Sequence, residues 1–439
     1  MLDDNIPQPW RARSTLVLTL TLVAVGLGNV QRLPFLIGEH GGGTFFLGYV
    51  LALCALSVPV MVAEVVLGSH GRASPGLALH WAASTANRDT RWRHLATAQA
   101  LLALVLAAVA ILTSVWCLHW AGVLYSGVLA SASAIDIAGE FLAYVDNRPA
   151  LFANTLMLSA AAGAVSALGI RLGLGFVAWV CLPAVAITLL GVLDFVFIYT
   201  DMRPVEEFLF ASRADHWRAD SLWRAVSAAG VTLGAGLGLG MALGAQSPTG
   251  LPWGRSVLAV AIIDTGFMLV TAVIVSALLF ETNVAPAEGL AALFTGLPYA
   301  FANLPLGETY GALFFGAMAL IAWGAAAVLL EPMVMLLADE WQLGRVSGAI
   351  LSATLVAMVI AGSLFMGELP LLQLGSLITE WLLPISLLAT AVFVGWLMPR
   401  PVLRGELFRE PKWLFQCWWI ALRWLVPTGC VVWLLGGTL

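Results

Sequence analysis

Long apolar stretches alternate with short polar segments along almost the whole chain of 439 residues. Crossing the hydrocarbon core of a bilayer, roughly 30 Å thick, takes about 20 mostly apolar helical residues. The pattern predicts an all-α integral membrane protein with about eleven transmembrane helices, at residues 14–36, 43–68, 95–128, 151–169, 174–199, 221–246, 256–281, 308–338, 346–366, 374–398 and 413–437. Glycines interrupt the first and the sixth of these segments, and we expect both helices to be broken.

The interruption of the first segment is the run GLGNVQRLP at residues 26–34, which a triple glycine follows at residues 41–43. A glycine inside a helix costs about 1 kcal/mol relative to alanine, and an arginine at membrane depth is expensive. Irregular backbone persists at that depth only where it is buried in protein or lines a cavity. We therefore expect residues 26–29 to be an unwound hinge that faces a binding site. A kinked but continuous helix with close glycine packing is the alternative.

A second run of glycines, TLGAGLGLG at residues 232–240, interrupts the sixth segment in the same way. Two broken helices that each open a set of five segments indicate a 5+5 inverted repeat, with a binding site near the membrane midplane between its halves. The expected division is a polar lead at residues 1–13, repeats at 14–200 and 221–398, and an eleventh transmembrane helix at 413–437.

Composition supports the membrane class and argues against several others. Hydrophobic residues make up 61% of the chain and charged residues only 10%, with a mean hydropathy of +0.94, whereas a soluble domain carries about 25% charged residues. The 5 cysteines lie in apolar runs without the spacing of a disulfide framework or a zinc site. No Ser/His or Asp/Asp pairing at helical spacing suggests an intramembrane enzyme.

The polar segments between the apolar stretches predict the orientation. Arginines gather in alternate loops, at residues 72–93, 171, 255, 345 and 400–409, and Lys412 is the only lysine. The opposite loops carry acids such as Asp201, Glu206 and Glu207. The excess of basic residues in cytoplasmic loops places the N-terminus in the cytoplasm of the inner (plasma) membrane and the C-terminus outside. The apolar stretch at residues 286–305 is expected to be a re-entrant lid on the outer face.

Several runs resemble the neurotransmitter:sodium symporter family, which has the LeuT fold. These are GLGNVQRLPF with GEHGGGTFFLGY, then PVMVAEVVLGSHGR around Glu64, then Glu331-Pro332 with LADE, and LLPISLLATAVFVGWLMP. The first run is long and specific, and the likeness covers spans one to ten. The resemblance implies secondary transport of an amino acid, a related zwitterion or an amine by alternating access, coupled to sodium.

The resemblance also implies the positions of the sites. A substrate site would be lined by Ala24, Gly26, Leu27, Gly28, Ala110, Ser114, Val231, Thr232, Gly234, Leu237, Ala325 and Leu329. A first sodium site, open to protons as well, would use Ala24, Asn29, Thr232 and Asp264, and a degenerate second one Leu22, Val25 and Ile321. Arg32 and Glu64 would be gate residues, which control access to the substrate site. The positions given for span six depend on the alignment with the family: aligning the last glycines of the run at residues 232–240 instead shifts each of them by two residues.

This chain departs from the family pattern at several of these positions. Ser114 stands where the family has its substrate-binding tyrosine, and Gly324 and Ala325 replace the two hydroxyl residues of the second sodium site. Sodium needs oxygen ligands, so we expect no conventional ion there. Gly375 replaces the acidic partner of Arg32, and Met268 stands at the chloride-site position.

Asp264 stands where the family uses an asparagine in its first sodium site. A charged carboxylate in a bilayer core requires a compensating partner, which is either a cation held with Asn29 and Thr232 or a proton. Gly26 stands where amine-selective members carry an aspartate, which favours a substrate that brings its own carboxylate. A purely structural carboxylate that bonds the broken ends of span one or six is the alternative.

The sequence leaves two function classes open. One is an ion-coupled symporter, with sodium as the one cofactor, no organic cofactor, a small-molecule substrate and the lipid bilayer as partners, and no nucleic acid. The other is a transport-deficient sensor or regulatory subunit with the same fold, which would account for the lost ion and substrate ligands. The substrate and the oligomeric state stay open.

Overall fold

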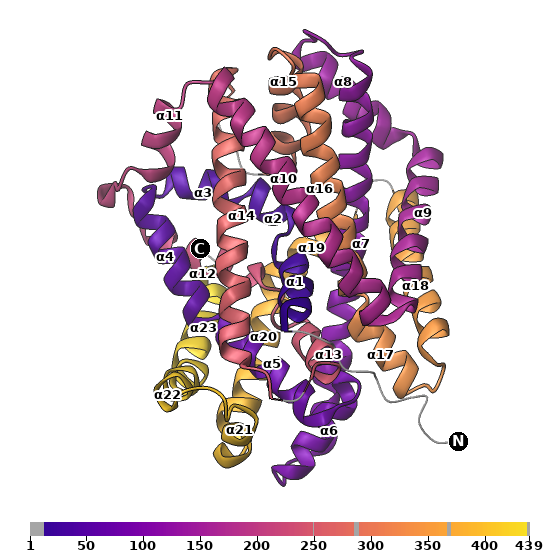
Figure 1. Cartoon of the computed structure of the whole chain (residues 1–439), viewed down its shortest axis with the longest axis vertical. Coiled ribbons are helices and arrows are strands. Elements are labelled where there is room, and N and C mark those ends of the chain that lie inside the picture. Colours follow the sequence, from indigo (N-terminus) through magenta and orange to yellow (C-terminus); the bar gives the residue numbers. More distant parts are fainter. Residues whose placement is uncertain (1–12, 249, 285–288, 367–369, 437–439) are drawn as a thin grey trace.

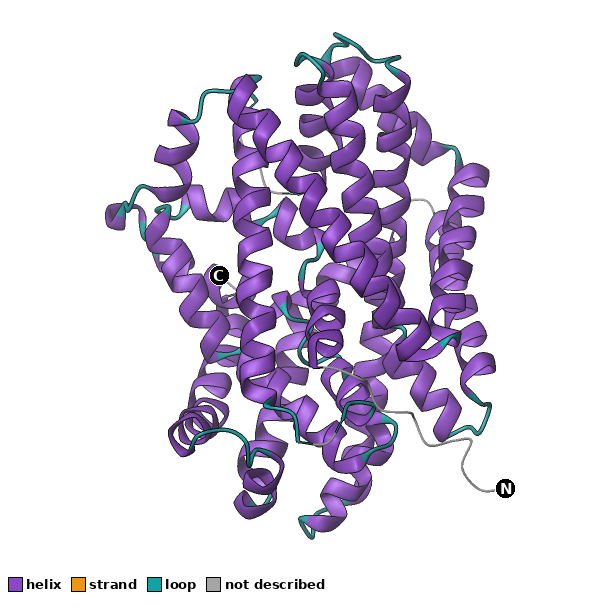
Figure 2. Cartoon of the chain, in the orientation of Figure 1, coloured by secondary structure: helices purple, strands orange, loops and turns teal. Residues whose placement is uncertain are grey.

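The structure is a computed structural model that describes residues 13–248, 250–284, 289–366 and 370–436. Within these residues the chain is helical apart from turns, loops and one isolated β-bridge between Gly42 and Ser212 (Figure 2). The predicted all-α class is confirmed. Residues 1–12 of the expected lead and residues 286–288 of the expected lid lie outside the described residues.

Nine apolar helical segments in the described part of the chain are long enough to cross a membrane without a break. They are Gly43–Gly71, Thr90–Ser126, Arg148–Ala167, Ile170–Tyr199, Trp253–Glu281, Gly307–Asp339, Arg345–Met366, Pro370–Leu397 and Lys412–Gly436. They agree with the predicted segments within about five residues at each end. The total of eleven stays a prediction, because the remaining two are assembled from half-helices that are each too short to span.

The α-helices within these nine segments are α4 (Gly43–Ala55), α5 (Ser57–Gly71), α7 (Arg93–Ser126), α9 (Arg148–Ala167), α10 (Gly175–Tyr199), α14 (Trp253–Glu281), α16 (Gly307–Leu329), α17 (Glu331–Asp339), α18 (Arg345–Met366), α19 (Pro370–Leu377), α20 (Leu383–Val392), α22 (Lys412–Ile420) and α23 (Val426–Gly436). Short helices at the two ends of the molecule are α3 (Leu33–Glu39), α6 (Pro75–Thr85), α8 (Ala134–Asp146), α11 (Arg203–Val205), α15 (Leu297–Ala302) and α21 (Arg400–Glu406). Two short segments are 3-10 helices, η1 (Thr90–Trp92) and η4 (Ala214–His216). Six short segments are π-helices: η2 (Ile170–Leu174), η3 (Glu206–Phe210), η5 (Ala292–Gly296), η6 (Ile378–Leu382), η7 (Phe393–Leu397) and η8 (Ala421–Leu425).

The first predicted break is real but shorter than expected. Helix α1 (Arg13–Ala24) ends, Gly26 adopts an extended backbone at φ −86° and ψ 162°, and α2 (Leu27–Gln31) begins at once. A second bend follows at Arg32, where α2 gives way to α3. The expected unwound stretch 26–29 is therefore corrected to the two residues Val25 and Gly26. One extended residue is enough to redirect the chain.

The second break is longer. Helix α12 (Ala219–Thr232) and helix α13 (Leu239–Ala245) are separated by six residues. Gly234, Gly236 and Gly238 have φ values of 67°, 81° and 72° there, in the left-handed region that side chains with a Cβ disfavour. The alternating glycines are thus what allows this segment to stay unwound inside the protein.

Both breaks lie inside the bundle (Figure 1). Helix α1 packs against α10, α14 and α16, and α13 packs against α5 and α17. Most residues of α1 and all residues of α13 are buried, and each of these half-helices ends at a break inside the protein. Their backbone polar groups must therefore be satisfied by protein groups or by bound ligands.

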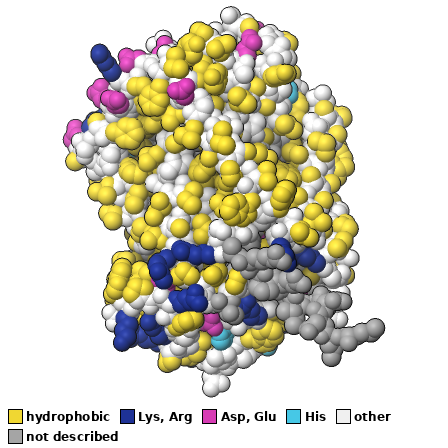
Figure 3. Space-filling view, in the orientation of Figure 1, with side chains coloured by type: hydrophobic (Ala, Val, Ile, Leu, Met, Phe, Trp, Pro, Cys, Tyr) yellow, Lys and Arg dark blue, Asp and Glu magenta, His cyan; other side chains and the backbone are white. Residues whose placement is uncertain are grey.

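Charged side chains separate to the two ends of the molecule. On the face shown in Figure 3, most lysine and arginine side chains lie below a broad apolar band and most acidic side chains lie above it. The basic end holds α6, α21 and the start of α22 (Figure 1). The described half of the expected outer lid is helical, as η5 and α15.

Candidate functional site

The end of the first half of span six meets a buried carboxylate and a phenol. Thr232 is the last residue of α12, and its hydroxyl donates to the Ala228 carbonyl at 2.8 Å. The Tyr49 hydroxyl of α4 lies 3.1 Å from the same Thr232 oxygen and can donate to it. Asp264 of α14 is fully buried and near enough to Tyr49 for its charge to act on the phenol. Two predicted ion-site residues are thus brought together.

The other two residues of the predicted first site flank the first hinge. Ala24 ends α1, and its carbonyl accepts the Gly26 amide at 2.7 Å. Asn29 falls in α2, and its side chain lies outside the described part of the structure, as does that of Leu27. Helix α1 packs directly on α14, the helix of Asp264.

A carboxylate, hydroxyls and a main-chain carbonyl are hard oxygen ligands, and these suit an alkali or alkaline-earth cation or a proton. Within the described residues, no group of three or more His, Cys, Asp and Glu side chains is arranged to hold a metal ion. The cluster of Tyr49, Thr232 and Asp264 carries one formal negative charge. That charge matches one monovalent cation or one proton better than a divalent metal.

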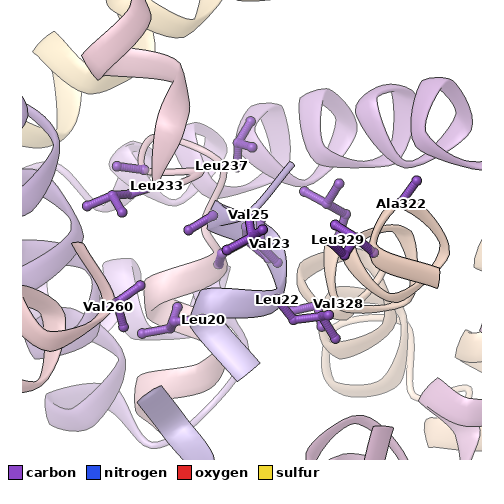
Figure 4. Close-up of a cluster of buried hydrophobic side chains, with 14 of the residues drawn as sticks. Leu20, Leu22, Val23, Val25, Leu233, Leu237, Val260, Ala322, Val328 and Leu329 are labelled. Atoms are coloured by element: carbon purple, nitrogen blue, oxygen red, sulfur yellow. The ribbon is translucent and has the colours of Figure 1, made fainter. Parts of the chain in front are cut away.

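The position predicted for a second sodium ion is filled by a side chain. Leu22 of α1 is fully buried, and a Cβ added at Gly324 of α16 would meet its two methyl carbons at 2.9 and 3.0 Å. Figure 4 shows Leu22 beside Val328 within a cluster of apolar side chains. The leucine therefore packs into the space that a hydroxyl side chain at residue 324 would occupy, next to the predicted positions Val25, Ile321 and Ala325.

The substrate positions around the hinge also form an apolar environment. Leu237 and Leu329 lie in the same cluster as Val23 and Val25 (Figure 4). Gly234 lies close enough to this cluster that a Cβ there would meet Val23 Cγ1 at 3.1 Å. Gly26 borders a cavity of about 10 Å³, the space of about one water molecule, together with Val25, Val30, Phe267, Met268, Thr271, Met318 and Ile321.

Other predicted substrate positions differ in their surroundings. Ser114 of α7 is buried and donates its hydroxyl to the Ala319 carbonyl of α16 at 2.8 Å, so this donor is engaged inside the protein. Gly28 is exposed, and nothing lies within 4 Å of a Cβ built on it. Ala110 and Val231 are half-buried. Their part in substrate binding stays a prediction.

Glu64 supports the longer of the two breaks. This fully buried carboxylate of α5 accepts the backbone amides of Gly236 at 2.8 Å, Gly238 at 3.3 Å and Gly240 at 3.0 Å. Helical hydrogen bonds are missing at these residues, and the carboxylate replaces them. Arg32 lies at the bend between α2 and α3 and is half-buried. The gating role of both residues stays a prediction.

Two buried polar networks were not predicted from the sequence. Glu331 is fully buried and binds Arg345 through both oxygens, at 2.9 and 2.8 Å, while Gln246 donates to it at 2.8 Å. Gln99 donates to Ser386 at 3.1 Å and to Thr390 at 2.9 Å. Ser386 in turn donates to the Gly236 carbonyl at 2.6 Å. In the sequence Arg345 looks like an ordinary basic residue of a loop, because nothing near it in the chain indicates that it pairs with Glu331.

Comparisons with known proteins point to one family. The profile of the sodium:neurotransmitter symporter family matches residues 8–129. The chain is 24% identical over 98% of its length, and 98% of the relative, to the uncharacterised sodium-dependent transporter YhdH of Bacillus subtilis. It is 21% identical to one of Methanocaldococcus jannaschii, over 95% of this chain and 88% of that protein.

A solved structure agrees over the whole chain. The crystal structure of MhsT in complex with L-phenylalanine superposes with a TM-score of 0.86 at 20% identity, covering 98% of this chain and 99% of MhsT. This chain is similar to the sodium:neurotransmitter symporter family over residues 8–129 and to bacterial and archaeal sodium-dependent transporters over nearly its whole length. It has the LeuT fold of that family, with broken helices in spans one and six, and is a multi-pass membrane protein.

The extent of the profile match separates the two halves of the candidate site. The profile match over residues 8–129 includes the first hinge, Tyr49 and Glu64, which retain the family pattern. Thr232, Asp264 and Gly324 lie beyond that match. Of the departures from the symporter pattern, those at Asp264, Met268, Gly324 and Ala325 lie beyond the match, along α14 and α16, whereas that at Ser114 lies within it.

Proposed function

We propose that the protein is a secondary active symporter for a small zwitterion, an amino acid or a related amine, coupled to sodium or protons at one site. The observation that carries the proposal is Asp264. It is a buried carboxylate near Tyr49, whose hydroxyl group lies within hydrogen-bond distance of Thr232, and it belongs to the helix that packs against α1 and α2. Three relatives are named sodium-dependent transporters, and MhsT was crystallised with L-phenylalanine.

The coupling ion would neutralise Asp264. Desolvation favours the protonated acid and a bound sodium ion favours the carboxylate, so proton and sodium should compete for the same residue. The second ion position is apolar, because Leu22 packs against Gly324. The proposal is accordingly one coupling ion per substrate. We further propose the plasma membrane as the location, with the N-terminus in the cytoplasm, on the evidence of the basic end of the molecule.

Substitution of Asp264 by asparagine tests the proposal. In proteoliposomes, wild-type uptake of labelled amino acids should depend on sodium, and acidification should reduce that dependence. Asp264→Asn keeps the shape of the side chain, and it should abolish the competition between sodium and protons. Gly26→Leu, which adds a side chain at the hinge, should abolish substrate binding and serves as the comparison variant. Unchanged sodium and pH dependence in Asp264→Asn would make this carboxylate structural.

One alternative has specific support. Ser114 donates its hydroxyl inside the protein, and Leu22 occupies the second ion position, which are two losses expected of a transport-deficient sensor or regulatory subunit. The same uptake assay separates the two functions. A sensor would bind a ligand, detected as a rise in thermal stability, without moving it across the membrane.

A further inference from the structure

The basic end of the molecule carries a cavity that is separate from both breaks and from the Asp264 cluster. Helix α21 and the start of α22 border an open cavity of about 310 Å³, lined by Arg400, Pro401, Arg404, Lys412, Phe415 and Gln416. Figure 3 shows the basic side chains of this end below the apolar band. Lys412 begins the candidate membrane span Lys412–Gly436, so the cavity lies at one end of a span.

Three cations border this cavity, and aromatic rings hold two of them in place. The Arg400 guanidinium lies 5.7 Å from the centre of the Phe415 ring and 4.7 Å from that of Trp419. Arg404 lies 5.4 Å from the Phe415 ring centre. Stacking on a ring leaves the N–H groups at the edge of a guanidinium available for an oxyanion.

None of the three cations is neutralised by a carboxylate of the described chain. Arg400 and Lys412 form no ion pair there, and Arg404 gives one nitrogen to the carbonyls of Leu407 and Glu410. The nearby carboxylate of Glu410 is paired with Arg255 at 3.2 Å instead. Uncompensated arginine and lysine around one cavity favour a phosphate group as its occupant.

Phe415 also borders a second, apolar cavity of about 420 Å³ between α4, α5 and α22. Its wall includes Leu51, Cys54, Val58, Leu414, Trp418 and Leu425. The helical rise between Leu414 and Leu425 is about 16 Å. This length is close to half of a hydrocarbon core that is roughly 30 Å thick, so the groove matches the depth of one leaflet.

We propose that these two cavities form a binding site for one anionic phospholipid. The phosphate would lie between Arg400, Arg404 and Lys412, and an acyl chain would follow the groove past Phe415 and Trp418. The bound lipid would belong to the membrane leaflet at the basic end of the molecule. It does not depend on the proposed transport function, because it shares no residue with the hinge or the ion site.

Native mass spectrometry of the purified protein, titrated with phosphatidylglycerol or phosphatidylcholine, tests the site. One phosphatidylglycerol should bind preferentially. Arg400→Gln combined with Lys412→Gln should weaken that binding roughly tenfold or more. Arg88→Gln combined with Arg91→Gln removes the same charge from exposed arginines at the same end and should leave it unchanged. An equal loss in both double variants, or equal binding of both lipids, would overturn the proposal.

A second variant tests the groove without changing charge. Cys417 is exposed and borders the apolar cavity, so Cys417→Trp should fill part of it and weaken phosphatidylglycerol binding severalfold. Inorganic phosphate should compete with the lipid only weakly, because it has no acyl chain. Full competition by millimolar phosphate, with no effect of Cys417→Trp, would identify a site for free phosphate and refute the lipid site.

Discussion

At the scale of single residues, one contact between α1 and α16 bears on how many ions the protein binds. Leu22 is fully buried, and its methyl carbons occupy the space beside Gly324. Replacing Gly324 alone by threonine should therefore overpack this contact and lower the free energy of unfolding by about 1–3 kcal/mol. A lower melting temperature without any new sodium dependence is the expected result.

The converse variant makes room before it adds oxygen ligands. Leu22→Ala combined with Gly324→Thr and Ala325→Ser shortens the leucine and supplies two hydroxyls. Sodium should then raise the melting temperature more steeply than in the wild type, with a second equivalent bound at saturation. Two sodium equivalents in the wild type, measured by isothermal titration, would contradict the one-site interpretation.

The sequence predicted half of this contact. The missing hydroxyls at Gly324 and Ala325 are visible from residue types alone, because sodium requires oxygen ligands. That the Leu22 side chain points into the same space depends on how α1 and α16 pack, which no local pattern contains. For the same reason, the hydrogen bond from Tyr49 to Thr232 could not be predicted from residues 183 apart in the chain.

At the scale of elements, the two broken helices are stabilised differently. The first break needs one extended residue, Gly26, whereas the second leaves six residues without helical hydrogen bonds. Glu64 compensates the second break through three backbone amides. The carboxylate is thus a substitute for the missing turn of span six.

Glu64→Gln tests this role because it keeps the size of the side chain but replaces one acceptor oxygen by a donor. An amide donor facing the backbone amides of Gly236 to Gly240 should cost about 1.5–3 kcal/mol of stability. Hydrogen exchange should accelerate across residues 233–240 more than in α7, which provides the internal control. Equal acceleration throughout the protein would indicate global destabilisation instead.

Local sequence predicts that a helix is broken better than it predicts how long the break is. Glycine runs predicted that spans one and six are broken, and both predictions are confirmed. The first break was expected over residues 26–29, but the chain returns to helix at Leu27. Helix α2 carries Gly28 and Asn29, residues of low helical propensity, so its formation reflects packing against neighbours rather than local preference.

At the scale of the whole molecule, the basic end is tied together by contacts between distant segments. Glu406 of α21 accepts hydrogen bonds from His70 Nδ1 at 3.2 Å and from Ser69 at 3.2 Å, both at the end of α5. The hydrogen bond from His70 lowers the pKa of Glu406 below its ordinary value. The contact between Glu406 and the end of α5 therefore stabilises the packing of α21 on α5 when the Glu406 carboxylate is ionised.

The pH dependence of that contact has a definite sign. A carboxylate whose pKa is lowered by folding stabilises the protein above its unfolded pKa of about 4.3, and the contribution is lost as pH falls through the lower folded value. Glu406→Gln should thus melt earlier than the wild type at pH 7. The difference between the two should shrink as the pH falls from about 5 to about 3. A difference that is constant with pH would mean that charge plays no part.

The order of the spans was the most predictable property of the whole molecule. Apolar length alone located the nine uninterrupted segments, since a bilayer imposes nearly the same requirement on each. The buried ion pair of Glu331 with Arg345 was not predictable in this way. Its two residues look like a helix end and a loop charge until α17 and α18 are packed together.

The packing of Leu22 against Gly324 also sets an energetic limit on the symport proposed above. Each monovalent cation that crosses with a neutral zwitterion contributes about 2.3 kcal/mol per 100 mV of membrane potential, which supports roughly a 50-fold accumulation. Two such cations would support the square of that ratio, about 2,500-fold. A carrier with a leucine in place of the second ion would therefore come to rest at a much shallower gradient, and it would move half the charge for every substrate molecule.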